Sequence, residues 1–374
     1  MNQLLNAATK QQEPKAPLLR IVRRTTMPQY QAWLIRVGGL TAALLVGALL
    51  IASLGHNPLA VYADIIDSAF GSEIGFNETV RIAIPLLGAA LAIGLAFKMK
   101  FWNIGAEGQI LLGGIAATYF ALFHYDSMPS IVLLIVMGVA AALAGGLWGL
   151  IPAFFRAKWG TNETLFTLML NYIAFGFILF LQAGPWMSPT AGGFPIIDMF
   201  DQAARLPRLF GIHIGWIMVL VLTVAVYLYL TRSKQGYQLT VVGQSENTAR
   251  YAGMNVGRII MRTMFISGAI AGFVGFMQVS GANFTLNEGT AGGVGFTAIT
   301  VAWLSHLNPL IMVLVAAFIA ILQRGATRIQ TTFAIPATIA SVLIGIILFF
   351  MLACEFFINY RVIFRNRKGG QAHG

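Results

Sequence analysis

One acidic side chain lies where this sequence is otherwise suited to lipid. Glu107 belongs to the segment FWNIGAEGQI, residues 101–110, which separates two long apolar runs. An ionised carboxylate in hydrocarbon costs several kcal/mol, so such a residue faces the interior of a helix bundle or a water-filled cavity. On a helix, Glu107 would share one face with three small or polar residues at multiples of three or four positions, Asn103, Gly114 and Thr118.

Two interpretations of Glu107 follow from this placement. In the first, it belongs to the polar lining of a solute path or a gate, and the glycines around it let a ligand or another backbone approach closely. In the second, it is a structural residue that caps a shortened helix or pairs with Lys98 or Lys100 at the inner face. We adopt the first as our hypothesis and keep the second as the alternative.

A second polar stripe, formed by Thr164, Thr167 and Asn171, follows at helical spacing. Such groups either line a path or form hydrogen bonds between helices, which contribute about 0.6 kcal/mol each. Just before the stripe, Asn162 and Glu163 resemble a helix start, with a capping side chain and an acid that complements the helix dipole. Capping alone explains these two residues.

The inner loop 231–262 contains a short helical pattern in the stretch GQSENTARYAGMNVGR. Ser245 is suited to cap a helix in which Ala249 and Ala252 are small, and Gly253 is suited to end it. A short helix that projects from the membrane is suited to docking in a groove of a partner. The alternative is that this loop is only a solvated connection between two spans, without a partner.

The sequence lacks the common catalytic and metal-binding motifs. It has no G-x-x-x-x-G-K-[ST], so the chain cannot hydrolyse ATP through a P-loop, and it has no H-E-x-x-H or G-x-S-x-G. The single cysteine, Cys354, and the scattered histidines indicate neither a disulfide framework nor a metal site. We therefore expect no catalytic residue, no metal ligand and no cofactor in this chain.

Composition indicates the fold class that must position these residues. Hydrophobic residues make up 57% of the 374 residues and charged residues only 10%, against about 45–50% and about 25% in soluble domains. Several runs approach the roughly 20 apolar residues that cross a bilayer as a helix. The chain is therefore expected to be an all-α, polytopic integral membrane protein with one membrane domain.

Hydropathy predicts about ten spans, with ends uncertain by a few residues. They are Trp33–Leu54, Val80–Phe97, Ile104–Phe123, Ile131–Phe154, Glu163–Leu181, Ile212–Leu230, Ile259–Val279, Phe296–His306, Pro309–Leu322 and Ile335–Phe357. Phe296–His306 is too short to cross alone. Two glycine-rich interruptions, 103–114 and 288–295, fall in roughly corresponding places of the two halves, which is typical of a transport pathway.

The distribution of Lys and Arg predicts that both termini are cytoplasmic, because the inner segments then contain most of the 24 basic residues. This orientation accounts for the net charge of +11 without nucleic acid. The expected organisation is a loosely ordered cytoplasmic tail (1–31), a transmembrane domain (32–358) and a cytoplasmic C-terminal tail (359–374). Asn57-Pro58 predicts a short helix on the outer surface. The G-x-x-x-G pairs that begin at Gly145 and Gly268 predict close helix packing.

Several stretches together resemble a known family, the permease subunits of bacterial ABC importers for nucleosides and simple sugars, in the branched-chain amino acid and ribose permease superfamily. They are FKMKFWNIGAEGQI, RAKWGTNETLFTLMLNYIA, GQSENTARYAGMNVGR and GVGFTAITVAWLSHLNP, and the resemblance covers residues 80–358. The second stretch is similar to the purine-nucleoside branch. Thr300, Trp303 and Ser305 depart from the small or aliphatic residues usual in the family, and the indole of Trp303 can reshape the pathway.

The resemblance implies a multi-pass protein of the bacterial inner (plasma) membrane, surrounded by lipid. Its implied partners are a second homologous permease, an ABC ATPase that uses the ATP, and an extracytoplasmic substrate-binding protein. The substrate-path candidates become Asn103, Glu107, Gln109, Thr118, Thr167, Asn171 and Thr297. The candidates for coupling to the ATPase become Gly243, Ser245, Glu246, Ala249, Ala252 and Gly253.

Three alternatives remain at this point. The chain is an ABC permease for a sugar rather than a nucleoside, or it is an ion-coupled secondary transporter in which Glu107 is a proton or sodium site. A membrane enzyme that acts on lipid is the third, and it lacks a catalytic set.

Overall fold

The computed structural model describes residues 19–24 and 27–364. Their contacts form two compact units. The first contains the described residues up to Gly55 together with those from Gly345 onward, and the second contains His56–Ile344. The candidate site lies entirely in the second unit.

In the first unit, the two ends of the chain pair with each other. Strand β1 (Leu19–Arg23) pairs antiparallel with strand β4 (Tyr360–Phe364), next to helices α2 (Gln29–Ser53) and α14 (Ala337–Asn359). Between these two helices, Arg36 of α2 donates a hydrogen bond to the Glu355 carboxylate of α14 at 2.8 Å. Within the expected tail 1–31, residues 19–23 form β1, whereas residues 1–18, 25 and 26 lie outside the described residues. The partner of β1 is more than 300 residues away, so the local sequence carries no signal of the pairing.

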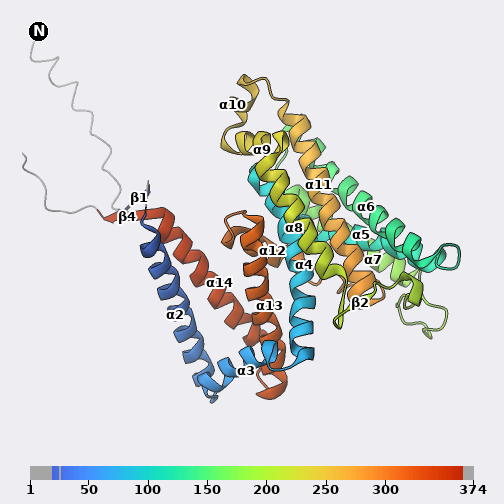
Figure 1. Cartoon of the computed structure of the whole chain (residues 1–374), viewed down its shortest axis with the longest axis horizontal. Helices are drawn as coiled ribbons and strands as arrows, with labels where there is room; N and C mark the ends of the chain where they lie inside the picture. Colours follow the sequence, from blue (N-terminus) through green and yellow to red (C-terminus); the bar gives the residue numbers. More distant parts are fainter. Residues whose placement is uncertain (1–18, 25–26, 365–374) are drawn as a thin grey trace, which may run out of the picture. The chain divides into compact units, whose positions relative to one another are not determined.

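The second unit is a helical bundle (Figure 1). Its helices are α3 (Pro58–Phe70), α4 (Glu73–Lys98), α5 (Ala106–Phe123), α6 (Ser130–Trp159), α7 (Glu163–Ala183), α8 (Gly215–Arg232), α9 (Lys234–Gln244), α10 (Glu246–Tyr251), α11 (Val256–Met277), α12 (Val294–Leu304) and α13 (Pro309–Thr332). A π-helical turn (Gln278–Asn283) extends α11, a 3-10 turn spans Gln202–Ala204, and a small hairpin joins β2 (Arg208–Leu209) to β3 (Ile212–His213).

Among the described residues, nine helices are long and apolar enough to cross a membrane. This confirms the expected all-α, polytopic fold. The segment predicted as Phe296–His306 is α12, which has 11 residues. At 1.5 Å per residue it is about 16 Å long, roughly half of the hydrocarbon thickness. The expectation that it cannot cross alone is confirmed.

The core of this unit is the packing of α5, α6 and α11 through glycines. A Cβ at Gly145 of α6 would lie 2.7 Å from the Cα of Gly272, and a Cβ at Gly268 would lie 3.1 Å from the Cα of Gly146. Because real Cβ atoms do not approach backbone this closely, these backbones touch only if both helices carry glycine. The predicted packing role of the two G-x-x-x-G pairs is confirmed.

The short outer helix is confirmed as α3. Its N-cap is Asn57, whose Oδ1 accepts a hydrogen bond from the Leu59 amide at 3.0 Å, and Pro58 occupies the first helical position. Figure 1 shows α3 and β2 at one end of the unit and α9 and α10 at the other.

Candidate functional site

Two shortened helices begin next to each other inside the bundle. After α4 ends at Lys98, the chain turns back among the helices, and Asn103 in this connection is fully buried. Helix α5 starts from there, and the start of α12 packs against it so closely that a Cβ at Gly295 would lie 2.5 Å from the Glu107 amide nitrogen. The two glycine-rich interruptions noted in the sequence therefore meet in space.

The two helices diverge from this meeting point. At its far end α12 reaches the end of α4, where the Trp303 ring lies 5.9 Å from Phe97 and 5.6 Å from Trp102. Helix α5 runs the opposite way, parallel to α11, so its Gly113 packs on Gly272 and its Gly114 lies near Val279. Both N-termini, which carry the positive ends of the helix dipoles, therefore converge at one place.

Glu107 occupies that place. Its Oε1 accepts a hydrogen bond from the Gly293 amide and its Oε2 accepts one from the Gly295 amide, each at 2.7 Å. The carboxylate also lies in the first turn of α5 itself. Hydrogen bonds to an ionised acceptor are roughly twice as strong as neutral ones, so Glu107 attaches the start of α12 to the start of α5.

The surroundings of Glu107 bear on both interpretations of its role, as part of a solute path and as a structural residue. It caps a shortened helix, although the helix is the distant α12, and no ion pair joins it to Lys98 or Lys100 among the described residues. The side chain nevertheless stays partly exposed. Glu107 is therefore not fully enclosed by the packed core.

Behind Glu107, a buried amide pair holds the connection into α5. The Asn103 Nδ2 donates to the Gln109 Oε1 at 3.2 Å and to the Ser267 hydroxyl at 3.4 Å. The Asn103 Oδ1 accepts from the Gly105 amide at 3.0 Å and from the Gln109 Nε2 at 3.3 Å. These contacts satisfy Asn103 and Gln109 inside the protein.

The polar stripe on α7 supports the same connection. The Asn171 Oδ1 accepts from the Gly108 amide at 2.8 Å and its Nδ2 donates to the Ile104 carbonyl at 2.9 Å. The Thr167 Oγ1 accepts from the Ile104 amide at 3.2 Å. Thr118 is also buried and donates to the Gly114 carbonyl at 2.7 Å. The structure thus brings Asn103, Gln109, Thr167 and Asn171 together near Glu107, each in buried hydrogen bonds. Thr118 lies about three helical turns farther along α5.

One face of α12 is accessible and continues from Glu107. Thr297 is half-buried on this face and donates to the Gly293 carbonyl at 3.2 Å, and Thr300 is half-buried one turn later. Trp303 follows with 42% of its surface exposed, and its ring stacks on that of Trp102 with centroids 5.6 Å apart and planes 20° apart. The face therefore passes from a carboxylate through two hydroxyls to an aromatic stack.

The projecting segment forms two short helices, α9 and α10 (Figure 1). As predicted, Ser245 caps α10 by accepting from the Thr248 amide at 3.2 Å. Gly253 ends it with φ +76°, while the Met254 amide donates to the Ala249 carbonyl at 3.0 Å. Ala249 is buried, whereas most of the other α10 residues are exposed. Ala252, which follows α10, is also exposed.

Gly243 connects this projecting segment to the membrane helices. A Cβ at Gly243 would collide with the carbonyl oxygen of Lys98, at the end of α4. Only a glycine allows this approach, so α9 rests directly on the residues that precede Asn103.

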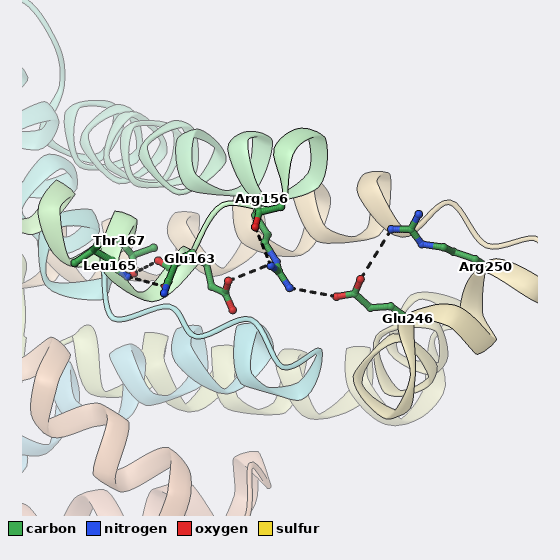
Figure 2. Close-up of polar contacts among 8 residues, drawn as sticks. Arg156, Glu163, Leu165, Thr167, Glu246 and Arg250 are labelled. Atoms are coloured by element: carbon green, nitrogen blue, oxygen red, sulfur yellow. Dashed lines mark hydrogen bonds and ion pairs between the residues drawn. The ribbon is translucent and has the colours of Figure 1, made fainter.

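One charged cluster was missed by the sequence reasoning. Arg156 at the end of α6 lies 3.4 Å from Glu163 and 3.7 Å from Glu246, which joins α10 to the start of α7 (Figure 2). The sequence pattern relates Arg156 only to membrane orientation, as one of the inner basic residues, and Glu163 only to the start of a helix. Asn162 does cap α7 as predicted, by accepting from the Leu165 amide at 3.2 Å. No sequence signal relates residues 156, 163 and 246.

Comparison with known proteins supplies independent information. Residues 75–352 match the family described as branched-chain amino acid transport system / permease component. The glucose ABC transporter permease protein of Haloferax volcanii is 33% identical over 368 residues, 95% of this chain and 96% of that protein. The guanosine ABC transporter permease protein of Bacillus subtilis is 30% identical, over 87% of this chain and 94% of that protein. The nucleoside ABC transporter permease protein of Lactococcus lactis is 30% identical, over 84% of this chain and 89% of that protein.

Proposed function

Because the chain belongs to the family of branched-chain amino acid transport system permease components, we propose that it forms the membrane path for a nucleoside in an ATP-driven importer. It is a multi-pass membrane permease component and not an enzyme. Permease components of this kind work with an ATPase and a substrate-binding protein. The observation that carries the proposal is the carboxylate of the half-buried Glu107, held between two helix N-termini inside the bundle.

The proposed path follows Glu107 and the accessible face of α12. A nucleoside carries hydroxyl and amide-like donors, and a carboxylate accepts hydrogen bonds without donating any. Thr297 adds a hydroxyl beside it. Glu107 and Thr297 are half-buried. The buried polar candidates then support the path from behind rather than touch the solute; they are Asn103, Gln109, Thr118, Thr167 and Asn171.

Two observations support a nucleoside as the solute. Two relatives at 30% identity carry guanosine and nucleoside in their names. In addition, Trp102 and Trp303 are 40% and 42% exposed and stack on each other, on the segments that carry the polar groups. Stacking of a base on an aromatic side chain contributes about 1–3 kcal/mol, so such a stack favours a solute with a planar ring.

A simple sugar is the second candidate, and one observation favours it. The relative named for glucose is 33% identical and matches nearly the whole chain. Sugar hydroxyls also donate to carboxylates, so Glu107 serves either solute. The aromatic stack is the feature that a sugar would use less.

Calorimetry on the partner binding protein tests the solute class. We expect the substrate-binding protein that works with this chain to bind one or more nucleosides at micromolar or lower concentration and to ignore glucose. Binding of glucose or ribose alone would reject the nucleoside and select the sugar. Uptake by vesicles that contain this chain alone, driven by a proton or sodium gradient, would reject the ATP-driven importer and select the ion-coupled alternative.

The wider assembly is part of the proposal. The transmembrane domain is taken as residues 32–358 with both termini cytoplasmic, in the inner membrane, and a second homologous permease completes the path. Pairing of β1 with β4 supports termini on one side of the membrane. The loop 231–262 would contact the ATPase through α10, with Gly243, Ser245, Glu246, Ala249, Ala252 and Gly253 shaping that surface.

Replacing Gly253 with valine is expected to uncouple transport from ATP hydrolysis. The left-handed conformation at φ +76° costs a residue with a Cβ about 1–2 kcal/mol, and a β-branched residue more. The space around Gly253 is open, so the change alters the end of α10 and not its packing. We expect normal membrane insertion and at least threefold lower substrate-stimulated ATPase activity of the assembled importer. Normal stimulation would contradict the role of α10 as the contact with the ATPase.

A further inference from the structure

Arg156 lies where three helices meet at the end of the unit that carries α10. It is in the last turn of α6, Glu163 is in the first turn of α7, and Glu246 is in the first turn of α10. Figure 2 shows the guanidinium between the two carboxylates, with Arg250 on the far side of Glu246. Nε of Arg156 is 3.4 Å from Glu163 and its Nη2 is 3.7 Å from Glu246.

We infer that Arg156 is a positioning residue that holds α10 against the membrane helices and relays movement of α10 to the connection that leads into α5 and Glu107. The inference rests on the proposed function, because it assumes that α10 is the part that an ATPase moves. It goes beyond that function by naming the side chain that links α10 to the transport path.

The charges explain why the cation is needed. Glu163 is buried, and an unpaired buried carboxylate is unfavourable. Arg156 is its ion-pair partner among the described residues. Without the guanidinium, Glu163 and Glu246 would face each other as two anions, and α10 would be pushed away from α7. Arg250 is a poor replacement because it is exposed and its nearest approach to Glu246 is 4.0 Å.

The contacts continue from Glu163 toward the path. The Glu163 carbonyl accepts a hydrogen bond from the Thr167 hydroxyl at 2.8 Å, and the Thr167 Oγ1 accepts from the Ile104 amide at 3.2 Å. Ile104 is three residues before Glu107. The turn of α7 that Arg156 ties to α10 is therefore the turn that holds the connection into α5.

The two ion pairs of Arg156 differ in burial and distance, and this difference suits a relay between α10 and α7. Glu163 is the more buried partner and the closer one, whereas Glu246 is more exposed and farther away. Since exposed pairs are screened by water and weaker than buried ones, the contact with α10 is the one that yields when α10 moves. Arg156 then stays paired with Glu163 of α7 while its contact with Glu246 of α10 is lost. The movement of α10 thereby changes the forces on the start of α7.

The test replaces Arg156 with glutamine in the complete importer and measures the solute imported per ATP hydrolysed. We expect this ratio to fall at least fivefold while the complex still assembles, and Arg156→Lys to recover part of it. The matched control is Lys158→Gln, which removes a cation two residues away that contacts aromatic rings, 4.9 Å from Trp159 and 5.6 Å from Phe154. The control should stay within twofold of the unaltered importer.

A second variant separates coupling from folding. Glu246→Gln leaves the buried Arg156–Glu163 pair intact and removes the link to α10 together with the exposed Arg250 pair at 4.0 Å, which contributes little, so it should lower the ratio with little change in thermal stability. The double variant with Arg156→Gln should be no worse than Arg156→Gln alone. A wild-type ratio in Glu246→Gln, or additive losses in the double variant, would overturn the inference. Absence of ATP-driven uptake by the unaltered importer would instead reject the proposed function.

Discussion

Replacing Glu107 with glutamine is expected to lower solute uptake at least tenfold while the importer still assembles. Glutamine keeps the size and one acceptor oxygen, but its NH2 group would face one of the two amides that now donate at 2.7 Å. Two donors that face each other repel, and the negative charge between two helix N-termini is lost. A tenfold loss corresponds to about 1.4 kcal/mol, which is modest against charge-assisted bonds of about 1.5–3 kcal/mol each.

The matched control for this change is Glu78→Gln at the other end of α4. Glu78 also loses its charge, but its partner is Arg81 at 3.1 Å, and the two side chains are 38% and 42% exposed. We expect uptake close to that of the unaltered protein. Uptake at the unaltered rate in Glu107→Gln, measured with labelled nucleoside in proteoliposomes, would leave Glu107 as a local structural residue.

Replacing Gly295 with alanine is expected to have an effect of similar size. The added Cβ would lie 2.5 Å from the Glu107 nitrogen and 2.9 Å from its Cα. Both contacts are with backbone, so α12 itself must shift, and overpacking of this kind costs about 1–3 kcal/mol. We expect at least tenfold lower uptake, together with a lower midpoint of thermal unfolding.

Gly176→Ala provides the comparison, because Gly176 is in helix α7 and has open space where the Cβ would go. Alanine is favoured over glycine in a helix by up to about 1 kcal/mol, so this variant should be as stable and active as the original. Equal behaviour of the Gly295 and Gly176 variants would show that close contact between α12 and α5 is not required.

Local patterns were sufficient for much of this fold. Runs of apolar residues identified the spans, and short-range capping signals identified the starts of α3, α7 and α10, because each depends on residues that are neighbours in the chain. The shortness of α12 was also visible, since the apolar run around Phe296 is bounded by glycines and by Asn308-Pro309.

The contacts between distant segments were not visible. Nothing local indicates that Glu107 accepts hydrogen bonds from amides 186 and 188 residues away. The same holds for the pairing of β1 with β4 and for the cluster around Arg156. Polar type and helical spacing singled out Thr167 and Asn171 as candidates but did not show whether they face a solute or the core. That distinction depends on which neighbouring backbone they meet.

The most direct test of the proposed path is the reactivity of a cysteine placed at Thr297. The chain has a single cysteine, Cys354, so Cys354→Ser provides a background without thiols. In the assembled importer, a water-soluble thiol reagent should modify Thr297→Cys at least tenfold faster than Val221→Cys, an exposed apolar position on α8. Saturating nucleoside and its binding protein should slow the reaction at Thr297. Equal, slow modification at both positions, unaffected by solute and ATP, would contradict a path along α12.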